Sequence, residues 1–160
     1  MRFTLTALTV LAAGCASPAT AEPPGVGVVV HVVDGDTIDV EIGGREERVR
    51  LIGIDTPEVH VEGGPPECWG VEASALTAEL VPTGTRVRLV RDVVPRDDYG
   101  RLLAYVHRVA DDLFVNEALL SAGAARPLSI PPNDTYAERF VDAVTAAERA
   151  ELGLWAACRG

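Results

Sequence analysis

The fold is decided by the stretch from Val30 to Glu58, which reads VHVVDGDTIDVEIGGREERVRLIGIDTPE. Asp34-Gly35 and Gly43-Gly44 are dipeptides typical of tight hairpin turns, and Pro57 stops the run that follows them. Between these signals lie β-branched and alternating apolar residues, which are typical of strands. They predict three consecutive strands, over residues 26–33, 37–42 and 46–54.

Working outward from this stretch, the patterns predict two more strands and the helices. A Gly/Pro-rich surface loop is expected up to Gly70, and Thr135 with Glu138 form a capping box that begins the last helix. Five short strands with a helix after the third predict an α+β domain, a closed antiparallel β-barrel of the OB-fold type. The later elements are a helix over 71–81 with Val71, Ala75, Leu76 and Leu80 on one face, strands over 85–94 and 101–109, a helix over 115–122, and a last helix with Phe140, Val144 and Ala147 on one face that ends at Gly153.

Composition limits the function classes. The 160 residues are 48% hydrophobic and carry a net charge of -10, which fits one globular domain and excludes a protein that finds nucleic acid through a basic surface. Every basic residue is Arg, so neither Schiff-base nor P-loop chemistry is available. Any bound phosphate must be held by Arg, backbone or metal.

Residues 1–21 have the layout of an export signal, with one positive charge, an apolar run too short to cross a bilayer, and then small residues. Leu11 to Cys15 resembles a bacterial lipobox, in which Cys15 would carry a lipid and provide the only membrane contact. Ala19-Thr20-Ala21 is the competing cleavage site of a secreted protein. The predicted organisation is a signal over 1–21, a tether over 22–25 and one domain over 26–160.

The cysteine count agrees with export. Of three cysteines, Cys15 would be lipidated or removed, which leaves Cys68 and Cys158 as a pair for an oxidising compartment to join. The alternative is two separate buried thiols. We predict the disulfide.

Charged residues gather where the predicted strands end. Carboxylates and a backbone carbonyl are ligands that a hard cation such as Ca²⁺ prefers, while Arg binds phosphate in a bidentate manner. Strict strand alternation would place Arg50 and Asp55 on opposite faces, so their convergence requires a bulge near Gly53 or a strand that ends before Asp55. The residues concerned are Asp34, Asp36, Arg50, Asp55, Thr56, Glu58 and Arg101.

These residues lie in motifs that resemble the thermonuclease, or staphylococcal nuclease-like, family over about Val30 to Trp155. The resemblance implies an OB-fold barrel with three helices, and a Ca²⁺-dependent phosphodiesterase that cuts DNA and RNA to products with 3′-phosphates. The motifs, in order, are V-x-D-G-D-T, R-L-x-x-I-D-T-P-E, G-x-E-A-S, D-x-Y-G-R-x-L-A-Y, V-N-E-x-L-x-x-x-G and P-N-x-T.

The resemblance also implies a role for each matched residue. It implies that Glu58 activates or orients the attacking water, and that Arg50 and Arg101 stabilise charge on the phosphate, with Arg101 on the leaving-oxygen side. The pKa of arginine is too high for easy proton donation, which favours this electrostatic role. The remaining matches are Asp36, Asp55 and the Thr56 carbonyl as metal ligands, Asp34 as a residue that supports them without contacting the ion, Tyr99 as a nucleotide contact, and Pro132 at a cis-proline position.

The chain departs from the family pattern at the nucleotide site. Leu128 and Ile130 stand where the prototype has two tyrosines, so base stacking worth about 1 to 3 kcal/mol per base is lost. Asp98 stands where the family has lysine. We therefore expect weaker nucleotide binding and a blunted salt dependence.

Three functions are compatible with these patterns. The one favoured is an exported, monomeric Ca²⁺ nuclease acting on DNA, RNA or both, either secreted or anchored to the cell envelope. The second is a catalytically silent OB-fold module that binds nucleic acid or protein. The third is an envelope lipoprotein whose barrel is an interaction scaffold only, in which Arg50 and Arg101 would be dispensable.

Overall fold

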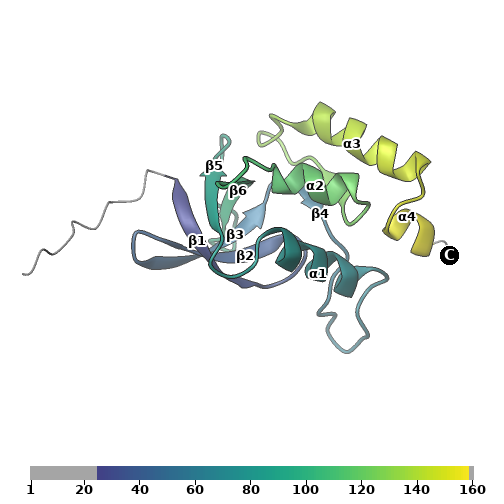
Figure 1. Cartoon of the computed structure of the whole chain (residues 1–160), viewed down its shortest axis with the longest axis horizontal. Helices are drawn as coiled ribbons and strands as arrows, with labels where there is room; N and C mark the ends of the chain where they lie inside the picture. The colour runs from purple at the N-terminus through teal and green to yellow at the C-terminus, as the bar shows by residue number, and fades with distance from the viewer. Residues whose placement is uncertain (1–24, 159–160) are drawn as a thin grey trace, which may run out of the picture.

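The computed structural model describes residues 25–158, so the predicted export signal, Cys15 and nearly all of the tether lie outside the described residues. Five strands close into a barrel in the order β1-β2-β3-β6-β5, and a separate ribbon pairs β4 with β7 (Figure 1). The barrel strands are β1 (Val26–Val32), β2 (Thr37–Ile42), β3 (Arg45–Leu51), β5 (Arg86–Val90) and β6 (Leu102–Arg108), and the ribbon strands are β4 (Gly53–Asp55) and β7 (Arg126–Leu128).

The barrel is mixed and not wholly antiparallel as predicted. Strands β3 and β6 run parallel, with Val49 beside Leu102 and Leu51 beside Ala104. The other four neighbouring pairs are antiparallel. A closed ring with an odd number of strands cannot alternate direction throughout, so one parallel pair is required.

Helices close one side of the barrel, and α2 and α3 lie next to each other (Figure 1). The described residues form three main helices and a one-turn helix that the sequence analysis missed, as it also missed β7. None of the helices in residues 25–158 has the length and apolarity needed to cross a membrane. The helices are α1 (Gly70–Leu80), α2 (Val115–Ser121), α3 (Ala137–Arg149) and the one-turn α4 (Leu154–Ala157).

Two helix predictions were wrong in detail. Helix α1 buries Ala73 and Thr77, while Val71 is 54% exposed, because the Oγ1 hydroxyl of Thr77 donates to the Gly35 carbonyl. Helix α3 begins at Ala137 without a capping box. The Thr135 hydroxyl donates instead to Oδ1 of Asp92 at 3.0 Å.

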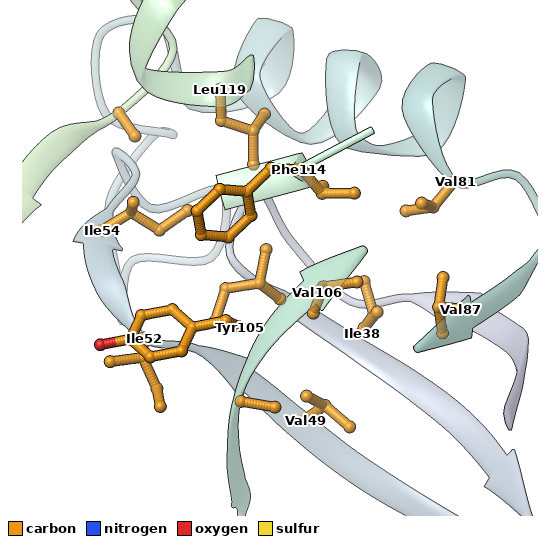
Figure 2. Packing of buried hydrophobic residues seen from close by; sticks show 14 of the residues in the cluster. Ile38, Val49, Ile52, Ile54, Val81, Val87, Tyr105, Val106, Phe114 and Leu119 are labelled. Atoms are coloured by element: carbon orange, nitrogen blue, oxygen red, sulfur yellow. The ribbon is translucent and has the colours of Figure 1, made fainter. Parts of the chain in front are cut away.

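The core fills the barrel and the space beneath α2 and α3 (Figure 2). Ile38 and Val40 are fully buried inside the barrel, as the predicted alternation over 37–42 requires, and Val49 and Val106 join them. Tyr105 continues the core toward the helices, packing edge-on against Phe114 at 6.1 Å between ring centroids. On β2 the alternation fails, since Thr37 and Asp39 on the polar face are also buried. The closed barrel provides a rigid support for the residues at its strand ends.

Candidate active site

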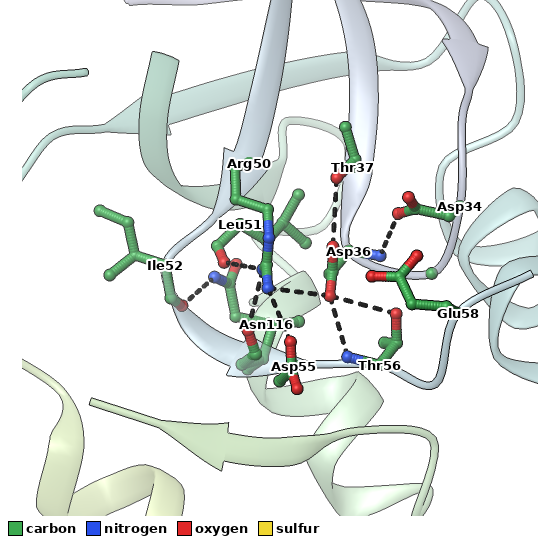
Figure 3. Close-up of polar contacts among 12 residues, drawn as sticks. Asp34, Asp36, Thr37, Arg50, Leu51, Ile52, Asp55, Thr56, Glu58 and Asn116 are labelled. Carbon is green, nitrogen blue, oxygen red and sulfur yellow. Dashed lines mark hydrogen bonds and ion pairs between the residues drawn. The ribbon is translucent and has the colours of Figure 1, made fainter. Parts of the chain in front are cut away.

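Arg50 lies at the break between β3 and β4 (Figure 3). Gly53 has a positive φ of 80° and contacts the Phe140 ring so closely that a Cβ would not fit. The chain turns here, which brings Nη2 of Arg50 within 3.0 Å of Oδ1 of Asp55. The predicted irregularity near Gly53, which brings the side chains of Arg50 and Asp55 together, is confirmed.

The Arg50 guanidinium is held in place by backbone carbonyls. Its Nη1 donates to the carbonyl oxygens of Leu51 at 2.9 Å and Ile54 at 2.8 Å. The buried Asn116 supports the same break, because its Nδ2 donates to the Ile52 carbonyl at 2.8 Å (Figure 3). With its side chain 14% exposed, Arg50 is a rigid and partly desolvated cation.

Asp36 is the buried carboxylate of the site. Its Oδ2 accepts the Thr56 N–H at 2.9 Å and lies 3.1 Å from Nη2 of Arg50, while its Oδ1 accepts the Thr37 hydroxyl. Burial raises the pKa of Asp36 to about 6, although the Arg50 charge and the Thr56 N–H act to lower it. One guanidinium therefore links the two predicted metal carboxylates, Asp36 and Asp55.

The turn that carries Asp36 depends on close packing with Thr56. Gly35 has no positive φ, so the turn does not need glycine for its backbone conformation. A Cβ at Gly35 would lie 2.6 Å from Oγ1 of Thr56, which explains the glycine. Asp34 accepts the Asp36 N–H at 3.1 Å and thereby supports the turn.

Glu58 lies just beyond β4, and Figure 3 shows its carboxylate on the same side of the site as Asp34 and Asp36. Partial burial, followed by the negative charges of Asp34 and Asp55, raises the pKa of Glu58. The local charge is negative in spite of Arg50.

Arg101 lies directly after a surface turn, just before β6, and pairs with Asp97 of that turn. Its Nε donates to Oδ2 of Asp97 at 2.7 Å, and its backbone N–H donates to Oδ1 of the same residue. Tyr99 is 87% exposed, with the Arg101 guanidinium 5.5 Å from its ring centroid. Arg50 and Arg101 nevertheless line the same cleft of ≈ 420 Å³, together with Tyr99, Leu128 and Ile130.

Comparisons with known proteins show the family of the chain. Residues 48–157 fit the family model described as staphylococcal nuclease homologue. The chain belongs to the staphylococcal nuclease homologue family. It is 43% identical over 128 residues to a thermonuclease of Staphylococcus intermedius, covering 80% of this chain and 74% of that protein. It is 39% identical over 127 residues to a thermonuclease of Staphylococcus hyicus, covering 79% and 73% respectively.

The chain is also 39% identical over 127 residues to the SPbeta prophage-derived endonuclease YokF of Bacillus subtilis (strain 168). The match covers 78% of this chain and 42% of that protein. The predicted family, the OB-fold barrel and the enzyme class, a nuclease among the hydrolases, are confirmed by this membership.

The donors near Arg50 fit a hard cation that keeps water ligands. No three acidic, histidine or cysteine side chains among residues 25–158 are close enough to share an ion. The set present is two carboxylates, Asp36 and Asp55, with the backbone of Thr56 beside them. After burial, the negative charges of Asp34 and Asp55 raise the pKa of Glu58, and a divalent cation would neutralise that charge.

The sequence analysis did not assign functions to three residues that organise this nuclease site. Asn116 and Thr77 hold the two turns described above, and Asp97 holds Arg101. The partners of Asn116 and Thr77 lie in distant parts of the chain, and the contact of Asp97 with Arg101 depends on the geometry of a turn. No local sequence pattern therefore identifies these three residues. The predicted pair Cys68 and Cys158 is joined as a disulfide in the structure.

Proposed function

We propose that this member of the family is an exported, Ca²⁺-dependent nuclease that hydrolyses phosphodiester bonds of DNA, RNA or both and leaves 3′-phosphates. The observation that carries the proposal is the Arg50 guanidinium, which is held within 3.1 Å of Asp36 and within 3.0 Å of Asp55 beside a cleft that also contains Arg101. Two arginines and two carboxylates about one cleft are suited to a phosphoryl group and a cation.

The charged residues have separate roles in the proposed reaction. Asp36, Asp55 and the Thr56 carbonyl would hold the ion, which when bound supplies positive charge to the phosphoryl oxygens. Arg50 is pre-oriented by its carbonyl contacts and stabilises charge that develops on the phosphate. Arg101 uses Nε for Asp97, and we assign its terminal nitrogens to the leaving oxygen.

Glu58 orients or deprotonates the attacking water. It needs only to be ionised and within reach of one water molecule. Burial and the neighbouring carboxylates raise its pKa, which makes the Glu58 carboxylate a stronger base than an exposed glutamate. Tyr99, exposed at the edge of the cleft, contacts the nucleotide.

The proposal also covers the export, localisation and oligomeric state of the protein. We infer that residues 1–21 direct export, that Cys15 carries a lipid or is removed with the signal, and that the domain over 26–160 acts as a monomer. Mass spectrometry of the mature protein tests the signal, since a lipidated Cys15 and a cut after Ala21 give different N-termini. Sedimentation of the same sample tests the monomer.

Cleavage of single-stranded DNA by the purified mature protein in ~10 mM Ca²⁺ tests the activity, at a concentration above typical extracellular-site affinities. EGTA and Arg101→Ala should each abolish cleavage. Arg149→Ala, which removes an exposed arginine at the end of α3, is the matched control and should cleave normally. A protein that Ca²⁺ stabilises but that does not cleave would favour the silent binding module.

A further inference from the structure

The loop between β4 and α1 is closed at its base by contacts of Glu58. The Glu58 N–H donates to Oε2 of Glu67 at 3.0 Å, and the Glu67 N–H donates back to the Glu58 carbonyl at 2.9 Å. Gly70 packs against the same carbonyl, since a Cβ there would lie 2.6 Å from its oxygen. The backbone of Glu58 is thus part of the point where the loop leaves and rejoins the fold.

The disulfide ties this point to the C-terminal helix. Cys68 follows Glu67 directly and is bonded to Cys158, with 5.8 Å between the Cα atoms. Helix α4 is itself anchored, because the Leu154 N–H donates to the Gly123 carbonyl at 2.8 Å and Leu154 is buried. The far end of the disulfide is therefore a fixed point.

From α4 the contacts continue to the second carboxylate of the site. The Arg126 guanidinium lies 4.7 Å from the ring centroid of Trp155 in α4. Arg126 belongs to β7, where it is the register partner of Asp55 in β4. Glu58 and Asp55 are thus held from two sides, by the loop base and by the ribbon. The disulfide ties the loop base covalently to the end of α4, and α4 contacts the ribbon through Trp155 and Arg126.

We propose that Glu67 and the Cys68–Cys158 disulfide are positioning groups for the reaction, which hold the Glu58 backbone in place relative to Asp55. The inference rests on the proposed function, because it gives Glu58 a part in cleavage. Residues 60–66 of the loop between Glu58 and Glu67 are exposed and include Gly63 and Gly64, so few packing contacts constrain the loop. Small misplacements of a reacting group cost large factors in rate, so the anchor affects kcat.

The first test removes the disulfide as Cys68→Ser with Cys158→Ser and measures DNA cleavage at saturating Ca²⁺, well below the melting temperature. We expect kcat to fall by about tenfold while KM changes by less than about twofold, since a displaced base slows the chemical step without removing substrate contacts. Val144→Ala, a destabilising change in the core beneath α3, is the matched control and should keep kcat.

The second test separates the hydrogen bond of Glu67 from its charge. Glu67→Ala should lower kcat as the disulfide variant does. Glu67→Gln should keep kcat, because an amide oxygen still accepts the Glu58 N–H. If both substitutions lower kcat equally, the hydrogen bond is not what positions Glu58.

A third measurement asks whether the effect passes through Glu58. In a Glu58→Gln background, loss of the disulfide should bring no further loss of kcat, and an equal further loss would overturn the proposal. Hydrogen exchange supplies a readout without activity. Removing the disulfide should speed exchange of the Glu58 and Glu67 amides, while the Leu51 amide, bonded to the Asp36 carbonyl at 2.9 Å, stays protected.

The outcomes distinguish this inference from the proposed function. If the oxidised wild type does not cleave DNA, the proposed function fails, and unchanged exchange at Glu58 would reject the anchor as well. If the wild type cleaves and the disulfide variant keeps its kcat, only the inference fails. Should the double serine variant not fold, reduction of the exposed disulfide in the wild type with a dithiol, together with the two Glu67 variants, gives the same decision.

Discussion

The two arginines of the cleft are held in contrasting ways. Arg50 is 14% exposed and bonded to two carbonyls and two carboxylates, all of which lie in the barrel rim and the β3–β4 break. Arg101 is 31% exposed, and its Nε and backbone N–H both donate to Asp97 within its own surface turn. The difference separates a charged centre held by partners from several elements from an exposed arginine held within one turn.

The largest expected effect tests the rigid side of this contrast. Arg50→Ala should lower kcat/KM by about 10³-fold, because a pre-oriented donor for transition-state charge is lost. It should also cost about 3 kcal/mol of unfolding free energy, because buried Asp36 loses its cation. DNA cleavage and urea denaturation measure the two effects. Unchanged stability with lost activity would mean that Asp36 does not depend on Arg50.

A second prediction concerns how the buried Asp36 carboxylate affects folding stability when no metal is bound. The pKa of Asp36 rises to about 6 on folding, so its contribution favours folding at low pH and is lost as pH rises from about 4 through about 6. In EGTA, Asp36→Asn should be more stable than wild type by about 1 to 3 kcal/mol at pH 7.5, with the gain vanishing near pH 4. Urea midpoints at both pH values check the sign, with Asp142→Asn on α3 as control. A gain in stability of equal size at both pH values would contradict the raised pKa of Asp36.

Substitutions at exposed positions of the cleft should have smaller effects, on substrate binding. Ile130 is 62% exposed in the cleft, where Ile130→Tyr supplies a ring for base stacking. KM for single-stranded DNA should fall by about tenfold, which corresponds to about 1.4 kcal/mol within the usual range for one stacked base. Val141→Tyr places a ring on exposed α3 and should leave KM as it is. A fall in KM for both variants would show that any surface ring suffices.

The smallest effect concerns Asp98, which also lines the cleft. With the acidic wild type, kcat/KM should change little between about 20 and 200 mM NaCl, because few counterions are released on binding. Asp98→Lys should steepen the slope of log kcat/KM against log salt by about 0.7, the value for one phosphate contact on a single strand. A steep slope already in the wild type would remove the contrast between the two regions.

Much of the barrel was predictable from residues close in the chain. The bounds of β2 match the prediction, and β1 and α2 end one residue earlier than predicted. The break at Gly53 followed from the need to bring Arg50 and Asp55 together, and the buried face of α3 with Phe140, Val144 and Ala147 followed from helical spacing. These features depend on turn residues and on side-chain periodicity, which the sequence shows directly.

The rest depended on partners far apart in the chain. Strand β7 exists because it pairs with β4, and Thr135 leaves the expected cap because Asp92 is within reach. The Asp97–Arg101 pair is the exception, because the two residues are four apart, but their contact depends on the geometry of one turn that no spacing rule predicts. By itself the sequence determined the barrel strands and the motif residues, because these are written in local pattern, and it paired Cys68 with Cys158 by counting. Only the tertiary structure decided which charge faces which, because that choice depends on contacts made when the barrel closes.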